Sequence, residues 1–132
     1  MLVVDASIAA KWVFAEPDSE RALALATREA SIAAPALILA ELANVAWKRV
    51  RKGAWGAEDA SESVLVAAGM FTLIVPIEEL WIDALALSLR LDHPIYDCFY
   101  LALARQQAAP IASADTRMIG IAEAIGLVIE PY

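Results

Sequence analysis

Four acidic side chains each stand as the only charge in a long apolar stretch of the sequence. They are Asp5 within residues 1–10, Glu41 within 30–47, Asp97 within 94–104 and Asp115 within 108–116. A carboxylate in apolar surroundings either takes up a proton or finds a positive partner. Because the chain has only 10 Lys and Arg residues in all, we expect the four carboxylates to meet in space around divalent cations.

A site built only from carboxylate oxygens indicates both a metal and a reaction. Oxygen ligands suit Mg²⁺ or Mn²⁺. His93 is the only histidine and Cys98 the only cysteine, which excludes a His-rich zinc site and disfavours a Ser-His or Cys-His nucleophile pair. A carboxylate metal site in a small protein indicates metal-assisted hydrolysis of a phosphodiester, which needs no covalent intermediate. Without metal the carboxylates repel one another, so at least one pKa should rise.

The candidate residues also have ordinary structural explanations. Asp115 could cap the last helix and Asp97 could be a first-turn acid that favours the helix dipole. Ser7 is either a helix cap or an active-site hydroxyl. We expect His93, which precedes a proline in a turn, to be an inert surface residue, and Cys98 to lie in the core. These explanations fit any one acid better than they fit all four together.

The basic residues are few, and their roles stay open at this stage. A net charge of −7 has the wrong sign for a protein that holds nucleic acid by charge alone. The only dense basic run, within residues 48–52, is either a solvated helix end or a track for RNA. Lys11 and Arg117 are either phosphate contacts or solvated charges, and Asn44 is either structural or substrate-binding.

The composition indicates buried contacts with a partner. Apolar residues make up 61% of the chain and the mean hydropathy is +0.59, which indicates a large interface in a homodimer, with a second protein, or both. No uncharged apolar run reaches the ~18–20 residues needed to cross a membrane. Residues 1–5 read as a strand rather than a signal peptide. A single cysteine fits a reducing cytoplasm, where we expect the protein to act.

Short β-rich runs alternate with helical patterns along a single domain that spans residues 1–132. Strands are expected at 2–5, 31–34, 71–76, 111–113 and 127–130, and helices at 7–14, 18–30, 35–51, 57–69, 78–91, 96–107 and 116–125. The alternation predicts a three-layer α/β/α sandwich around a mainly parallel, five-stranded sheet. Ligands bind such sheets beyond the carboxyl ends of the strands, where the strand order reverses. If the first and fourth strands are neighbours, Asp5 and Asp115 lie side by side.

With the four acids placed on these elements, the chain resembles the PIN domain and, within it, the VapC-type toxins of bacterial toxin–antitoxin pairs. The similar segments are LVVDASIAAKWVF at 2–14, EPDSE at 16–20, APALILAELANVAWK at 34–48, IYDCFYLALA at 95–104 and IASADTRM at 111–118. No single segment is specific, but the four acids in this order cover nearly the whole chain.

The resemblance implies a function for particular residues. Asp5, Glu41, Asp97 and Asp115 match the family's acidic metal-binding and catalytic quartet, and Ser113 matches a position that helps to hold the site. The implied activity is that of a Mg²⁺- or Mn²⁺-dependent endoribonuclease that cleaves RNA. The implied partners are a second copy of the chain and a cognate antitoxin protein, whose tail covers the active-site groove.

Three other functions remain in competition. A housekeeping RNA-processing nuclease would use the same residues, and a catalytically silent PIN-like module would only bind RNA or protein. An aspartyl-phosphate hydrolase also begins with a strand that ends in Asp, but it requires a second Asp two residues later. This chain has Ser7 at that position, which makes the third alternative weak.

Overall fold

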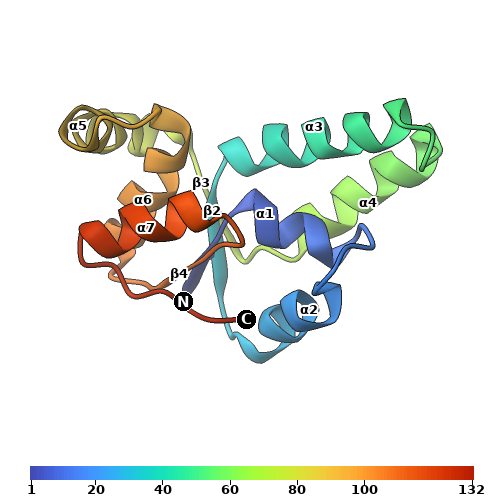
Figure 1. The fold of residues 1–132 in the computed structure, drawn as a ribbon, viewed down its shortest axis with the longest axis horizontal. Helices are drawn as coiled ribbons and strands as arrows, with labels where there is room; N and C mark the ends of the chain where they lie inside the picture. Colours follow the sequence, from blue (N-terminus) through green and yellow to red (C-terminus); the bar gives the residue numbers. More distant parts are fainter.

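The computed structural model describes all 132 residues, in which short strands alternate with helices (Figure 1). The strands are β1 (Leu2–Val4), β2 (Ile32–Pro35), β3 (Leu73–Val75) and β4 (Ile111–Ala112). The α-helices are α1 (Ala6–Ala9), α2 (Ser19–Arg28), α3 (Leu37–Arg51), α4 (Ala57–Gly69), α5 (Trp81–Leu91), α6 (Ile95–Gln107) and α7 (Thr116–Ala124). Two 3₁₀ helices, η1 (Ala10–Trp12) and η2 (Ile77–Glu79), complete the set. None of these helices is long and apolar enough to span a lipid bilayer.

The four strands form one parallel sheet in the order β3-β2-β1-β4. The α/β fold with a parallel sheet is therefore confirmed, but the sheet has four strands rather than the five predicted. The expected fifth strand is reduced to a single bridge, in which Ile129 pairs with Ile111. Two features limit it: β4 has only two residues, and Pro131 follows directly and has no N–H to extend a ladder.

The connections between strands explain the layers. From β1 the chain moves to β2 and then β3, and it then crosses back past β1 to β4. Right-handed crossovers place the helices of the first two steps on one face and those of the return on the other. Figure 1 shows α1–α4 to the right of the strands and α5–α7 to the left. The structure makes β1 and β4 neighbours, a condition that the sequence left open, and the strand order reverses between them.

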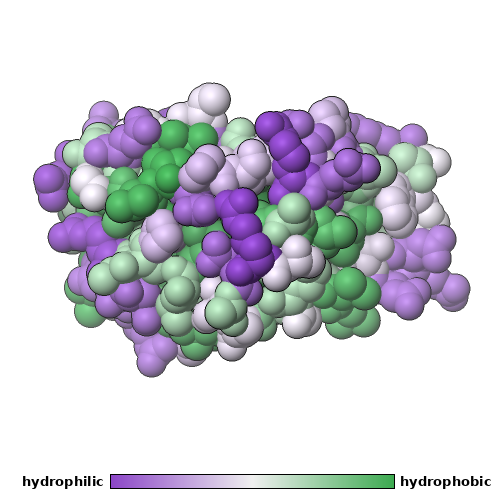
Figure 2. All heavy atoms as spheres, turned by 90° about the horizontal axis from the view of Figure 1, so that it is seen from below, coloured by the Kyte–Doolittle hydropathy of each residue, from purple (hydrophilic) through white to green (hydrophobic).

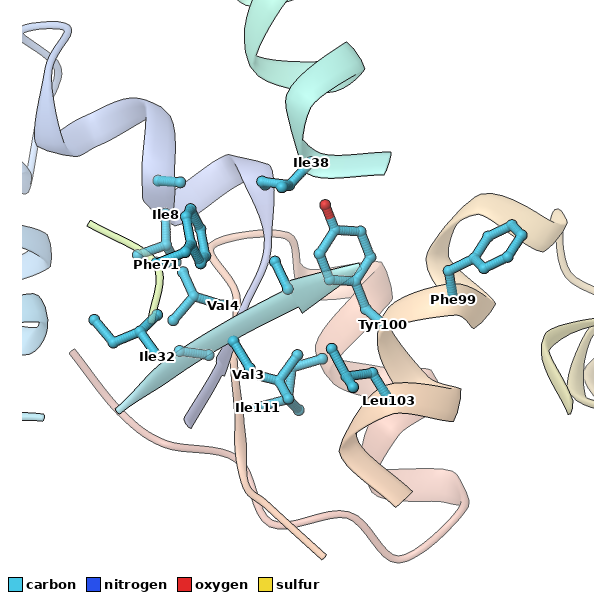
Figure 3. Packing of buried hydrophobic residues seen from close by; sticks show 14 of the residues in the cluster. Val3, Val4, Ile8, Ile32, Ile38, Phe71, Phe99, Tyr100, Leu103 and Ile111 are labelled. Carbon is cyan, nitrogen blue, oxygen red and sulfur yellow. The ribbon is translucent and has the colours of Figure 1, made fainter. Parts of the chain in front are cut away.

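The core is centred on β1 and α6. All three residues of β1 are fully buried, and every residue of α6 from 98 to 104 is buried as well. A strand covered on both faces reads as a continuous apolar run, which is why Leu2, Val3 and Val4 do not alternate with polar residues. Figure 3 shows side chains of α6 packed beside Val3, Ile111 and the other strand residues. Both elements that carry the first and third acids are therefore fixed by packing.

Local details differ from the predicted boundaries for identifiable reasons. Pro35 ends β2 instead of opening the next helix, since it pairs with Val75 of β3 at a level where β1 no longer runs alongside. Its missing N–H therefore costs no bond to β1. The predicted helix 78–91 is divided into η2 and α5, and the cap of α1 is Asp5 rather than Ser7.

Candidate active site

Asp5 lies at the carboxyl end of β1 and caps α1. Its carboxylate oxygen Oδ1 accepts hydrogen bonds from the backbone N–H groups of Ser7 (3.1 Å) and Ile8 (3.3 Å) and from the Ser7 hydroxyl (2.5 Å). Only 6% of the residue is exposed. Burial raises the pKa of this carboxyl, and the hydrogen bonds from Ser113, Ser7 and Ile8 oppose that rise. Asp5 is therefore a rigid, dry carboxylate held in one orientation.

Ser113 joins Asp5 to the loop after β4. Its hydroxyl donates to Asp5 Oδ2 and accepts from the backbone N–H of Asp115 (3.0 Å). The Ser7 hydroxyl likewise accepts from the Ala114 N–H (2.8 Å) while it donates to Asp5. A hydroxyl has one hydrogen, so both serines direct theirs at Asp5. The two loops at the reversal point of the sheet are thereby locked together through one carboxylate.

The two oxygens of Asp5 differ in what they can still bind. Oδ1 accepts three hydrogen bonds, whereas Oδ2 accepts one, from Ser113. A carboxylate offers about four lone-pair positions over its two oxygens. Oδ2 is therefore the oxygen that retains capacity for a ligand.

Glu41 lies on α3, one turn into the helix, and is half-buried. The Tyr100 hydroxyl donates to its Oε1 at 2.6 Å, and Figure 3 shows the Tyr100 hydroxyl directed toward the start of α3, beside Ile38. Burial raises the pKa of Glu41 and the Tyr100 hydrogen bond lowers it, while the charges of Asp5 and Asp97 raise it further. The charges of two other predicted acids, Asp5 and Asp97, thus act on Glu41.

Tyr100 is a site residue that the sequence interpretation missed. It is 1% exposed. Burial, then the charge and hydrogen bond of Glu41, hold its pKa well above the ordinary value of 10.0. The hydroxyl is therefore a proton donor at neutral pH. One signal was available: Tyr100 stands three residues after Asp97, so the two side chains share a face of α6.

Asp97 lies in the first turn of α6, and its Oδ2 is hydrogen-bonded to His93 Nε2 at 2.7 Å. The expectation that His93 is an inert surface residue is wrong, because its side chain is 5% exposed. Asp92 adopts a left-handed conformation (φ 48°) that ends α5 and turns the chain inward. His93 is thereby placed one turn ahead of Asp97, a spacing of four residues that the sequence displays.

Asp115 stands apart from the other three acids. It is exposed, it caps α7, and its Oδ1 accepts from the backbone N–H of Arg117 at 2.9 Å. Its charge is not among the causes that raise the pKa of Glu41. Its connection to Asp5 runs through the Ser113 hydroxyl. The structure therefore joins Asp5 to Ser113, places Asp5 and Asp97 where their charges act on Glu41, and leaves Asp115 at the rim, in the capping role that was its structural alternative.

The donor set suits a hard divalent cation, although the side chains are not arranged around one. All the acidic donors are carboxylate oxygens, which Mg²⁺ and Mn²⁺ prefer. No three Asp, Glu, His or Cys side chains converge closely enough to hold a metal ion. Glu41 is turned to Tyr100, Asp97 to His93, and Asp115 to its own helix. His93 and Tyr100 each engage one oxygen, Asp97 Oδ2 and Glu41 Oε1. Metal binding would therefore require the side chains to move closer together, with the second oxygen of each carboxylate taking the cation.

Comparisons with known proteins support the architecture. Residues 2–124 match the PIN domain family, and no curated protein sequence matches the chain. VapC20 of Mycobacterium tuberculosis, described as a sarcin–ricin loop cleaving toxin, has a TM-score of 0.75 at 17% identity, with 97% of each chain covered. PAE2754 from Pyrobaculum aerophilum has a TM-score of 0.73 at 18% identity, covering 97% of this chain and 82% of that one. A toxin–antitoxin complex from Klebsiella pneumoniae has a TM-score of 0.68 at 16% identity, covering 100% and 98%. Likeness at these identities is a likeness of fold.

Proposed function

Because this chain belongs to the PIN domain family, we propose that it is a divalent-metal-dependent endoribonuclease and the toxin of a toxin–antitoxin pair. The observation that carries the proposal is that the charges of Asp5 and Asp97 act on Glu41 at the carboxyl end of the sheet. A structural acid has no reason to be placed beside two others in a half-buried position, since their repulsion and desolvation cost stability. Binding of a divalent cation would explain why the three acids lie near one another.

In the proposed site, the acids would bind the cation and their hydrogen-bond partners would position the acids. Asp5, through the remaining lone-pair capacity of Oδ2, would hold Mg²⁺ or Mn²⁺ together with Glu41 and Asp97, and Asp115 would be a further ligand from the rim of the site. When bound, the cation supplies the positive charge that a phosphodiester needs at this acidic site and acidifies the attacking water. Ser7 and Ser113 keep Asp5 in place, and His93 and Tyr100 orient Asp97 and Glu41.

The aspartyl-phosphate alternative fits the geometry poorly. Asp5 Oδ1 already accepts three hydrogen bonds, and the Ser7 hydroxyl is one of those donors rather than a free acid or base. A nucleophilic carboxylate of this type needs a proton-transfer partner two residues later. Hydrolysis by an activated water needs no such partner at residue 7.

Two apolar surfaces suit the two proposed protein partners. One is the α3–α4 hollow, of ≈ 540 Å³, in which eight of nine lining residues are hydrophobic, including Trp47 and Leu65. A hollow between two helices fits the apolar face of a partner helix, so we assign it to the antitoxin. The other is the exposed α5 face formed by Ile82, Leu85 and Leu89, which we assign to a second copy of the chain.

An RNA cleavage assay under metal control tests the proposed activity. The purified protein should cut single-stranded RNA with Mg²⁺ or Mn²⁺ and stop in EDTA, and re-added metal should restore cleavage. A Glu41→Gln protein purified in parallel controls for contaminating nuclease and should be inactive. Undiminished cleavage by wild-type protein in EDTA would contradict the mechanism. Metal-bound protein that binds RNA and never cuts it would favour the silent module.

The toxin assignment needs a separate experiment in cells. Induced expression should arrest growth, and co-expression of the adjacent gene should relieve the arrest if that gene encodes the antitoxin. Glu41→Gln should be harmless at equal expression. A chain that cleaves RNA in vitro without affecting growth would instead indicate a housekeeping nuclease.

A further inference from the structure

A hollow that reaches Glu41 of the candidate site also contains the basic end of α3. It has a volume of ≈ 470 Å³. Its charged lining residues are the carboxylates Glu16 and Glu41 and the cations Lys11, Lys48 and Arg49. Both polarities meet in one surface feature, although the chain as a whole carries a net charge of −7.

The acidic and basic groups lie on one face of α3. Glu41, Asn44 and Lys48 are separated by three and four residues, the spacing that aligns side chains along a helix. All three line the hollow. Seven residues of helix span about 10 Å, so Lys48 stands about 10 Å along the axis from the carboxylate that would help to bind the cation. The amide of Asn44 lies between them and can donate two hydrogen bonds.

The three cations of the hollow are not equivalent. Arg49 pairs with Glu16 at 3.3 Å and lies over the Phe14 ring. Lys11 Nζ donates to the Pro17 carbonyl at 3.0 Å. Lys48 is exposed and has no ion pair or hydrogen-bonded side chain in the structure. Lys48 is therefore the cation that a ligand can take without breaking an existing contact.

We propose that this hollow is a phosphate subsite for single-stranded RNA, in which Lys48 and Asn44 hold backbone phosphates that flank the cleaved one. The inference rests on the proposed nuclease function and names where its substrate lies. The repeated phosphates of an RNA backbone would match the order of Glu41, Asn44 and Lys48 along α3. One phosphate would reach the metal ion held by Glu41, and a flanking phosphate would reach Lys48. An acidic peptide would meet Lys48 but would be repelled by the Glu41 end, which offers it nothing.

Removal of Lys48 is compared with removal of a matched charge. Lys48→Ala deletes an exposed basic residue from the last turn of α3, and Arg90→Ala deletes one from the last turn of α5, which does not line the hollow. Both variants lose one charge and the same interaction with a helix dipole. With Mn²⁺ and a short single-stranded RNA, Lys48→Ala should lower kcat/KM by about threefold to fivefold. Arg90→Ala should leave it unchanged, and Lys48→Arg should restore it.

The dependence on salt identifies the ligand as a phosphate. Each phosphate contact on single-stranded nucleic acid contributes about 0.7 to the slope of log affinity against log salt concentration. In EDTA, where no cleavage occurs, fluorescence anisotropy with labelled RNA should show that Lys48→Ala reduces this slope by about 0.7. Arg90→Ala should keep the wild-type slope. Equal slopes for all three proteins would overturn the subsite.

A scan of the RNA locates the phosphate. Single linkages are replaced by neutral 2′-deoxy methylphosphonates on each side of the cut. Replacement of one flanking linkage should weaken RNA binding by the wild type. It should have no further effect on RNA binding by Lys48→Ala, because that variant has already lost the same contact. If wild type cuts RNA and no position shows this, the subsite is wrong and the nuclease stands. If no RNA is cut, the proposed function fails as well. Preferential competition by an acidic peptide over RNA would assign the hollow to a protein.

Discussion

Asp97 is the acid whose chemical and structural roles can be separated most cleanly. It is about one-third exposed, and its one side-chain partner is His93. An asparagine keeps the shape and can still accept the bond from His93, but it removes a negative charge from the cluster. Asp97→Asn therefore changes the charge of the site and little else.

With metal present, Asp97→Asn should lower cleavage by about a hundredfold or more, since even partners of metal ligands cost 10–100-fold. In EDTA the variant should melt at the wild-type temperature or higher, because a repelling charge has been removed. If Asp97 is only a first-turn acid of α6, the substitution should have the reverse effect: a loss of roughly 0.5–1 kcal/mol of stability with cleavage intact. A variant that melts lower without metal and cuts at nearly the wild-type rate would eliminate Asp97 as a ligand.

Tyr100 acts on the cluster through Glu41 rather than on the substrate. Tyr100→Phe keeps the buried ring and deletes the hydroxyl that donates to Glu41. It should lower Mn²⁺ affinity about tenfold and stability by about 1–2 kcal/mol. Tyr96→Phe deletes the same atom from an exposed side chain of the same helix and serves as the control. Calorimetric titration with Mn²⁺ measures the first effect, and identical affinities for the two variants would show that Tyr100 only packs.

At the scale of elements, the site depends on two loops that β1 and β4 bring together. Ser113 is 4% exposed and connects Asp5 with the backbone that begins α7. Ser113→Ala should therefore cost about 1–3 kcal/mol, since it leaves a buried acceptor and an N–H without partners, and it should also weaken metal binding.

Ser61→Ala is the matched control for that variant. The Ser61 hydroxyl is exposed and bonds only to a carbonyl of its own helix, so its removal should change stability by less than about 0.5 kcal/mol. Urea unfolding of both variants gives the comparison. Ser113→Ala that unfolds like Ser61→Ala would show that the loops hold without this hydroxyl.

The elements differ in how well the sequence predicted them. The helix at 57–69 matches α4 and the one at 116–125 nearly matches α7, because their apolar periods and ends are local features. Alternation predicted the parallel sheet correctly, but it left the neighbouring positions of β1 and β4 open. The strand at 127–130 was wrong, since propensity says nothing about whether a partner strand is long enough to pair.

For the site, too, the sequence predicted local features better than features that depend on packing. Acids that are isolated in apolar runs were visible in the sequence, and the charges of two of them act on a third in the structure. The partners His93 and Tyr100 were missed because a histidine in a turn and a tyrosine in a helix look ordinary. Their role depends on which way α6 faces, a property of packing rather than of local sequence.

For the molecule as a whole, the carboxylate cluster makes stability depend on pH and metal. Burial raises the folded-state pKa of Asp5 and Glu41 above the ordinary values of 3.8 and 4.5. The folded protein therefore binds these protons more tightly than the unfolded chain. The two groups destabilise the metal-free fold above their raised pKa values and do so less as the pH falls toward the ordinary ones.

A divalent cation competes with those protons, so Mg²⁺ should stabilise the protein more at pH 7 than at pH 5. At ten times its Kd, a ligand adds about 1.4 kcal/mol, or roughly 4–5 °C in Tm. Melting curves at both pH values, with and without Mg²⁺, measure the effect, and in Glu41→Gln the Mg²⁺ effect should be smaller. An equal shift at both pH values would mean that the cation binds elsewhere.

Apolar surface is the second property of the whole molecule. On the face drawn in Figure 2, apolar patches remain exposed between polar side chains. Leu89 on α5 and Leu65 on α4 are among the most exposed, at 76% and 73%. If α5 forms the homodimer, the interface should bury on the order of 1,200 Å² or more.

Leu89→Lys should then yield a monomer by light scattering at micromolar concentration, while Leu65→Lys should stay dimeric and lose the antitoxin. The pair of variants tests both surfaces, since each is the control for the other. Wild-type protein that is monomeric at this concentration would argue against the homodimer, and loss of antitoxin in Leu89→Lys alone would exchange the two assignments.

The hydrogen bond between Ser113 and Asp5 joins residues 108 positions apart in the chain. During translation the central strand β1 is made before its neighbour β4 and before the serine that holds Asp5. At about 5–20 residues per second, that interval lasts roughly 5–20 s. The candidate site is therefore incomplete on the ribosome until Ser113 has been made. The proposed cleavage of RNA would accordingly be absent from the nascent chain during that interval.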